Sequence, residues 1–178
     1  MRPLLYLDVD GPLIPFGGDS VEHGPADAAN PLLNRIDPGL GPPLLALGCT
    51  LVWATTWMAD ANERVAPVLG LPDLAVVDWP DPRRDGVDAW FGLHWKTRPL
   101  VERSAGRPFI WVDDEITDAD RAWVAEHHRS PALLHRVDPA CGLTTGDLAH
   151  LARWVAAVKA GHSHDRIICA DHLSWRFR

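Results

Sequence analysis

Two carboxylates directly follow an apolar run near the start of the chain. Residues 4–7 are Leu-Leu-Tyr-Leu, and Asp8-Val9-Asp10-Gly11 comes next. A short apolar run that ends in acids and a glycine predicts a buried strand with both carboxylates at its C-terminal tip. In open parallel α/β sheets, ligands bind at that edge. Because two carboxylates at one tip repel each other, they need a cation between them or a shared proton. The segment therefore predicts a hard divalent metal ion and a carboxylate free to attack a substrate.

Apolar runs alternate with helical patterns along the rest of the chain. The runs predict strands, and the intervening 3.6-residue periodicity predicts helices. Thr117 or Asp118 is the expected N-cap of one helix. Pro99 requires another helix either to begin near it or to break there. This alternation predicts an α/β fold with three layers, a parallel five-stranded sheet between helices. The expected strands are 3–9, 50–55, 74–77, 108–112 and 131–137, and the expected helices are 42–47, 58–69, 94–104, 117–128 and 145–159.

The length of 178 residues fits one domain with an adequate core. We expect this catalytic domain to span residues 1–160. Residues 161–178 carry three histidines with poor periodicity and predict a loosely docked or disordered tail. Residues 11–43 and 78–90 are rich in turn-forming residues and predict long loops. The first begins directly after the twin aspartates, so we expect it to form one wall of the site, or a small lid.

Composition argues against several classes of protein. The net charge of −7 is opposite to the basic excess of a mainly electrostatic nucleic-acid binder. Cys49, Cys141 and Cys169 have no metal-ligand spacing and predict reduced thiols. The chain shows neither a signal segment nor an apolar run of the ~18 residues that a membrane span needs. We therefore expect a cytoplasmic protein with no membrane partner. Oligomeric state has no signature in the sequence.

Further polar side chains follow two other predicted strands. Thr55 and Thr56 follow one strand tip, and Asp113 and Asp114 follow another. Lys96 lies in a segment that can reach the same edge. If the strands that carry Asp8 and Asp113 are neighbours, the acids converge. Oxygen ligands of this kind suit Mg²⁺, which also binds substrate phosphate. The predicted metal ligands are Asp8, Asp10, Asp113 and Asp114.

Charge and position predict a role for each group. Asp8, the first acid at the strand tip, is the expected nucleophile toward phosphorus. Asp10 is the expected general acid to the leaving group and then the base for water. Thr55 can donate a hydrogen bond to a phosphoryl oxygen, and Lys96 can neutralise the charge that grows in the transition state. The expected catalytic residues are thus Asp8, Asp10, Thr55 and Lys96, and the expected substrate contacts are Gly11, Thr55, Thr56 and Lys96.

Several assignments stay open at this level. Thr56 competes with Thr55 for the phosphate, although Thr55 is preferred because it ends the apolar run. Arg98 is an alternative to Lys96 as the residue that neutralises charge in the transition state. Either Asp113 or Asp114 can touch the metal directly.

These residues, in this order, resemble the four motifs of the haloacid dehalogenase (HAD) superfamily. Asp8-Val9-Asp10-Gly11 resembles motif I, Thr55 motif II, Lys96 motif III and Trp111-Val112-Asp113-Asp114 motif IV. Pro12 departs from the small or branched residues that are more common after the glycine. A smaller HAD group, associated with RNA-repair proteins, is similar in three stretches: 53–57 with Ala61-Asn62, 111–115 and 142–144.

The resemblance implies a Rossmann-like sheet, Mg²⁺ and an aspartyl-phosphate intermediate on Asp8. The acid at position 10 is the pattern of phosphatase and phosphotransferase members, so the resemblance implies a phosphohydrolase acting on a phosphorylated substrate. About forty residues separate Asp10 from the second predicted strand, and about forty separate Thr55 from Lys96, which leaves no room for a separate cap domain. An open site of this kind resembles the capless members that act on macromolecular ends or phosphoproteins.

Two other classes remain as alternatives. A HAD-like scaffold that binds a phosphorylated ligand or partner without turnover would have no need of Asp10. A nicotinamide-dependent oxidoreductase shares the α/β pattern, but no G-x-G-x-x-G follows the first predicted strand. The candidate substrates are a nucleic-acid end, a nucleotide, a sugar phosphate and a phosphoprotein.

Overall fold

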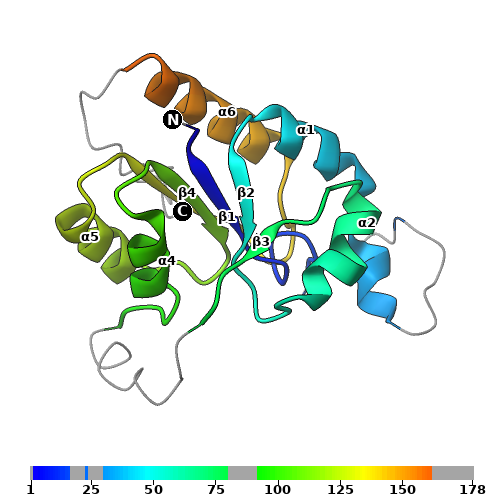
Figure 1. The fold of residues 1–178 in the computed structure, drawn as a ribbon. Helices are drawn as coiled ribbons and strands as arrows, with labels where there is room; N and C mark the ends of the chain where they lie inside the picture. Colours follow the sequence, from blue (N-terminus) through cyan, green and yellow to red (C-terminus); the bar gives the residue numbers. More distant parts are fainter. Residues whose placement is uncertain (1, 17–22, 24–29, 80–91, 162–178) are drawn as a thin grey trace, which may run out of the picture.

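Five parallel strands form the centre of the molecule. The structure is a computed structural model and describes residues 2–16, 23, 30–79 and 92–161. Every strand pairing is parallel, and the order is β3-β2-β1-β4-β5 (Figure 1). The predicted five-stranded parallel sheet is confirmed, with β1 at its centre. The strands are β1 (Leu4–Leu7), β2 (Thr50–Trp53), β3 (Ala75–Val76), β4 (Phe109–Asp113) and β5 (Ala132–Arg136).

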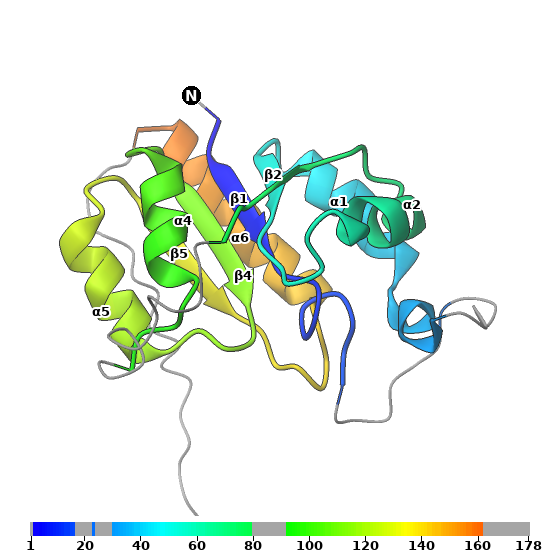
Figure 2. The same ribbon diagram turned by 60° about the horizontal axis from the view of Figure 1, so that its bottom comes forward.

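Helices cover both faces of this sheet, as the three-layer prediction requires. Figure 2 shows α4 and α5 in front of the sheet, α6 behind it, and α1 and α2 beside β2. The α-helices are α1 (Gly41–Ala46), α2 (Ala66–Leu69), α4 (Thr97–Ser104), α5 (Asp118–His127) and α6 (Thr145–Lys159). Two short 3₁₀ helices, η1 (Pro31–Arg35) and η2 (Pro38–Leu40), precede α1, and a π-helical turn, η3 (Ala61–Val65), precedes α2.

The two faces of β1 belong to different parts of the core. Leu5 and Leu7 pack in a cluster that includes residues of α1, α2 and α6. Leu4 and Tyr6 pack in a second cluster, with residues of α4 and α5. Successive side chains of a strand point to opposite faces, so a continuous apolar run is the pattern of a strand covered on both sides. Burial on both faces leaves the carboxyl edge of the sheet as the place for polar side chains.

Three predicted segments differ in detail from the structure. The predicted helix 58–69 begins later, at Ala61, because Met58 has a left-handed φ of 49° and turns the chain first. The predicted helix 94–104 begins at Thr97, which places Pro99 in the first turn, where its missing N–H costs no hydrogen bond. The predicted loop 11–43 contains η1 and η2, whose N-caps Asn30 and Asp37 accept backbone hydrogen bonds.

The described residues between β1 and β2, and between Thr55 and Lys96, form no separate domain. Within the part of the chain that the structure describes, no helix is long and apolar enough to cross a membrane. The predicted tail beyond Gly161 and most of the predicted loop 78–90 lie outside the described residues.

Candidate active site

The order of the strands brings acids from β1 and β4 together. Leu7 pairs with Val112, so Asp8 follows β1 at the level where Asp113 ends β4. Oxygen atoms of Asp8, Asp113 and Asp114 lie within 4.8 Å of one another. Asp113 is fully buried and Asp8 is 7% exposed. This carboxylate group lies at the carboxyl edge, where α/β sheets bind ligands.

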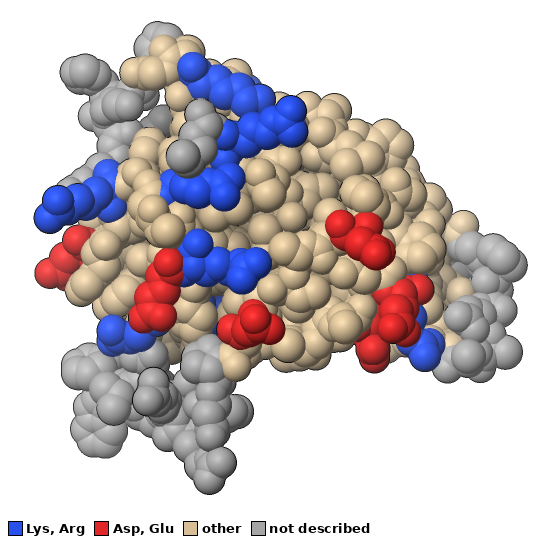
Figure 3. All heavy atoms as spheres, in the orientation of Figure 1, with Lys and Arg blue, Asp and Glu red and all other residues tan. Residues whose placement is uncertain are grey.

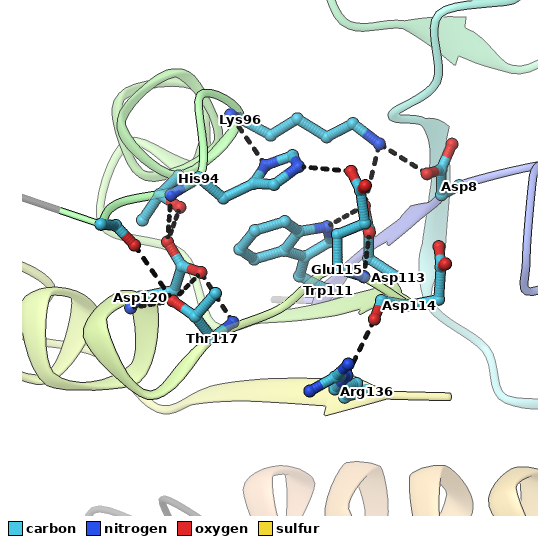
Figure 4. A network of polar contacts seen from close by, with 12 residues as sticks. Asp8, His94, Lys96, Trp111, Asp113, Asp114, Glu115, Thr117, Asp120 and Arg136 are labelled. Atoms are coloured by element: carbon cyan, nitrogen blue, oxygen red, sulfur yellow. Dashed lines mark hydrogen bonds and ion pairs between the residues drawn. The ribbon is translucent and has the colours of Figure 1, made fainter. Parts of the chain in front are cut away.

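Lys96 reaches this group from the N-terminus of α4 (Figure 4). Its Nζ lies 2.6 Å from Oδ2 of Asp8 and 2.8 Å from Oδ2 of Asp113, and the residue is only 3% exposed. Arg98, the rival in the sequence, has its guanidinium over the ring of Trp123, 4.9 Å from the centroid. The structure therefore brings Lys96 to the acids and directs Arg98 toward α5.

Asp113 and Asp114 differ in how their oxygens are used. Oδ2 of Asp113 also accepts a bond from the indole of Trp111 at 3.1 Å, and Oδ1 accepts the N–H of Glu115 at 3.0 Å. Asp114 is held through its backbone, whose carbonyl accepts from Nε of Arg136 at 2.8 Å. In the described part of the chain, no other residue donates a hydrogen bond to the Asp114 carboxyl. The carboxyl oxygens of Asp114 thus accept fewer hydrogen bonds than those of Asp113, and they are more available to a metal ion.

One ammonium group faces three carboxylates in this cluster. Burial raises the pKa of Asp8 to about 7; Lys96 opposes this shift, and the charge of Asp113 adds to it. Burial lowers the pKa of Lys96, but the carboxylates of Asp8 and Asp113 outweigh burial, so its pKa is raised. Burial and the charge of Asp113 also raise the pKa of Asp114. With all three carboxyls ionised, the cluster would carry more negative charge than Lys96 neutralises, so it favours uptake of a proton or of a further cation.

Gly11 is required by the close approach of two segments. Its φ is +80°, and a Cβ at this position would lie 2.5 Å from Cγ of Asp114. Glycine adopts this backbone conformation without strain and leaves the space that Asp114 occupies. The close packing against Asp114 thus explains why position 11 needs a glycine. The predicted contact of Gly11 with substrate stays a prediction.

The two adjacent threonines have different environments. Thr55 is fully buried just beyond β2, where its hydroxyl oxygen accepts the N–H of Trp57 at 3.3 Å. Its backbone carbonyl accepts the indole N–H of Trp79 at 3.1 Å. Thr56 is exposed. The hydroxyl proton of Thr55 has no acceptor among the described residues, and the predicted hydrogen bond from Thr55 to a phosphoryl oxygen stays a prediction.

The side chain of Asp10 is not part of the three-carboxylate group. Beyond β1 the chain folds back tightly after Val9, since Ile14 donates to the Val9 carbonyl and Gly11 donates to the Ile14 carbonyl. Oδ2 of Asp10 accepts the indole N–H of Trp57 at 3.0 Å. The structure brings three of the four predicted metal ligands together, and the ligand role of Asp10 stays a prediction.

Sequence reasoning missed the residues that hold Lys96 in place. The N–H of Lys96 donates to Nδ1 of His94 at 3.2 Å, so that nitrogen carries no proton. Nε2 of His94 pairs with Glu115 at 3.1 Å. The fully buried Asp120 accepts the N–H of His94 at 2.8 Å and the hydroxyl of Thr97 at 2.5 Å. The spacing of Thr117 and Asp120 fits a capping box and could have marked Asp120, but no pattern connects it to Lys96.

The fold and these four motifs define a HAD-type α/β protein, and comparison with known families specifies it further. A family model described as the HAD domain in Swiss Army Knife RNA repair proteins matches residues 4–148. The chain therefore belongs to this family, which confirms the resemblance to capless, RNA-repair-associated HAD domains. Membership supports a HAD-family hydrolase in general. Neither a search of curated proteins nor a search of solved structures produced a match.

Proposed function

We propose that the protein is a Mg²⁺-dependent phosphohydrolase that acts through an aspartyl-phosphate on Asp8. The observation that carries the proposal is the buried Asp8 carboxylate, which lies in contact with Lys96 and within metal-binding distance of Asp113 and Asp114. A structural salt bridge would need one acid for one lysine. Three acids around one lysine suit a site that takes up a cation and a phosphate.

The side chains of the cluster fit Mg²⁺. Asp8, Asp113 and Asp114 offer only carboxylate oxygens, the ligands that this ion prefers. When bound, the ion would neutralise the charge of the cluster and of the substrate phosphate, which lets a carboxylate approach phosphorus. Asp8, Asp113 and Asp114 would hold it, with Asp10 as a further predicted ligand.

The position of each residue suggests its role in the proposed reaction. A carboxylate oxygen of Asp8 attacks phosphorus, the bond to the leaving oxygen breaks, and Asp10 donates a proton to that oxygen. Asp10 next takes a proton from water, which attacks the phosphoryl group, frees phosphate and restores Asp8. Lys96 stabilises the phosphoryl oxygens throughout, and the Thr55 hydroxyl donates to one of them.

A phosphomonoester at a nucleic-acid end is the substrate class that we favour. The matched family is named for RNA repair, and the described residues form no cap domain over the site. Figure 3 shows that lysine and arginine side chains gather on the half of one face that carries α4 and the N-terminus, despite the net charge of −7. The N-terminus precedes β1 and Asp8 follows it, so the basic side chains near the N-terminus lie at the amino edge of the sheet, and the family description and the lack of a cap among the described residues carry the substrate proposal.

Asp8→Asn tests the mechanism directly. Turnover of 4-nitrophenyl phosphate and of 3′- and 5′-phosphorylated oligonucleotides should fall by at least about 10³-fold, because the amide is a poor nucleophile. Chelation of divalent ions should abolish wild-type turnover, and added Mg²⁺ should restore it. Asp118→Asn, at an exposed acid of α5, is the matched control and should keep full activity.

Two results would count against the proposal. Wild-type turnover by Asp8→Asn would exclude the aspartyl-phosphate. Tight binding of a phosphorylated ligand by the wild-type protein, with no turnover of any substrate in the panel, would instead favour the non-catalytic scaffold.

A further inference from the structure

The carboxyl of Asp10 is held by a residue from the turn after β2. The indole N–H of Trp57 donates to Oδ2 of Asp10 at 3.0 Å, and the two residues are 47 positions apart in sequence. In the part of the chain that the structure describes, this is the one hydrogen bond that the Asp10 side chain makes. Its backbone is fixed separately, by the tight turn between Val9 and Ile14.

Trp57 is itself firmly placed. Its backbone N–H donates to the Thr55 hydroxyl oxygen, and its half-buried side chain packs against the core cluster on the α6 side of the sheet. Thr55 and Trp57 thus form one turn after β2. The indole is therefore a fixed donor that the turn after β2 presents to the turn after β1.

The chemistry of the indole determines how Asp10 can use its two oxygens. An indole nitrogen only donates, so Oδ2 must face it with a lone pair. In a protonated carboxyl the carbonyl oxygen is the stronger acceptor, so this hydrogen bond favours the proton on Oδ1, the oxygen that the described residues leave free. A general acid needs its proton on the oxygen that faces the leaving group.

We propose that Trp57 is a positioning residue for proton transfer: its N–H holds Oδ2 of Asp10 so that Oδ1 delivers the proton to the leaving oxygen. The inference rests on the proposed phosphohydrolase function and adds a residue to it. Packing alone would be the other reason for a half-buried tryptophan here. The two roles differ in how activity depends on the leaving group.

Trp57→Phe separates the two roles, because it keeps a ring and removes the N–H. Protonation matters for a poor leaving group such as an alkoxide and little for 4-nitrophenolate. We expect kcat/KM for an alkyl phosphate to fall about tenfold or more, and kcat/KM for 4-nitrophenyl phosphate to fall less than about threefold. Because kcat/KM covers only the steps through leaving-group departure, later hydrolysis of the intermediate does not obscure the comparison.

Trp79→Phe is the matched control. Trp79 is also half-buried and also donates its indole N–H near the site, but to the Thr55 carbonyl. Loss of the Trp79 N–H should change kcat/KM by the same factor for both substrates. Trp57→His, which can still donate from its ring, should recover part of the alkyl phosphate activity. Equal losses for both substrates in Trp57→Phe, or no loss at all, would overturn the proposal.

A measurement that needs no turnover tests the contact itself. In ¹⁵N-labelled protein, the Trp57 indole resonance is the one that disappears in Trp57→His. Asp10→Asn should shift this resonance, because the carboxyl acceptor is gone, and should leave that of Trp79 in place. An unchanged Trp57 resonance would overturn the proposal even if Trp57→Phe fails to fold. If the wild-type protein shows no turnover but the Trp57 resonance shifts in Asp10→Asn, the phosphohydrolase function is refuted, while the contact between Trp57 and Asp10 stands.

Discussion

The N-termini of α5 and α6 carry the same local motif and use it differently. In α5, the Asp120 carboxyl accepts the N–H of Thr117 at 2.8 Å and its hydroxyl at 2.7 Å. In α6, the Asp147 carboxyl accepts the N–H of Thr144 at 2.8 Å and its hydroxyl at 2.6 Å. Each threonine hydroxyl oxygen accepts the aspartate N–H in return, at 3.2 Å. Both are capping boxes with an aspartate at the third position.

The second oxygen of each aspartate makes the difference. Oδ1 of Asp120 is buried and holds the N–H of His94 and the hydroxyl of Thr97, which flank the lysine of the site (Figure 4). Oδ1 of Asp147 lies 2.9 Å from Nε2 of His135 on β5, in a partly exposed position. One box therefore connects α5 to the segment that carries Lys96, and the other connects α6 to β5. The same sequence motif thus supports the candidate site in one place and only the packing of a helix in the other.

Removal of the two carboxyls should give the largest contrast. Asp120→Ala leaves four donors without their acceptor, namely the N–H of His94, the hydroxyl of Thr97, and the N–H and hydroxyl of Thr117, so we expect a loss of about 3 kcal/mol in the free energy of unfolding. Release of the turn around Lys96 should also lower kcat more than about tenfold. Asp147→Ala should cost about 1 kcal/mol and leave kcat within about twofold. Urea denaturation and phosphatase assays measure both; equal effects of the two variants would break the comparison.

Substitution of the partners of the second oxygens should give a smaller contrast. Thr97→Val keeps the shape of the side chain and removes the hydroxyl donor, which should cost about 1–2 kcal/mol and reduce kcat. His135→Phe keeps an aromatic ring beside His150 and should cost about 1 kcal/mol or less, with unchanged kcat. A loss of activity in His135→Phe that matches that in Thr97→Val would show that α6 also supports the site.

The N-cap threonines of the two capping boxes should contribute equally to stability. Thr117→Ala and Thr144→Ala each remove an N-cap hydroxyl and should each cost about 1 kcal/mol in the free energy of unfolding. Because this interaction is local, the two values should agree within about 0.5 kcal/mol. Chemical denaturation of both variants measures it, and a much larger cost for Thr117→Ala would mean that the cap and the site are coupled.

The smallest effect should be a pH dependence that belongs to α6. Burial raises the pKa of Asp147, but hydrogen bonds from Thr144 and the nearby His135 outweigh burial, so its pKa lies below the ordinary 3.8. A carboxyl with a depressed pKa in the folded state contributes stability above its unfolded pKa, and this contribution is lost as the pH falls below 3.8. Asp147→Asn should therefore lose less stability than the wild type between about pH 5 and about pH 2. Urea denaturation of both proteins at several pH values measures this difference. If the free energy of unfolding falls equally with pH in the two proteins, Asp147 makes no such contribution.

Patterns in the sequence were sufficient for the framework of this protein. Short apolar runs located all five strands, and an apolar period of 3.6 residues predicted α6 with its observed bounds. The acids at two strand tips predicted a shared edge, and strand order then brought Asp8, Asp113 and Asp114 together. Helix 58–69 was predicted less well, because the left-handed turn at Met58 has no glycine to mark it.

The sequence by itself determined the class of fold, the family and the acids that gather at one edge, because apolar periodicity and strand-end motifs are local properties of the chain. Only the tertiary structure decided that Asp8 and Asp113 contact Lys96, that Asp10 pairs with Trp57, and that Asp120 rather than Asp147 supports the site. Those pairings join residues from different strands and helices, and side-chain hydrogen bonds over such separations follow from packing, which local patterns do not encode.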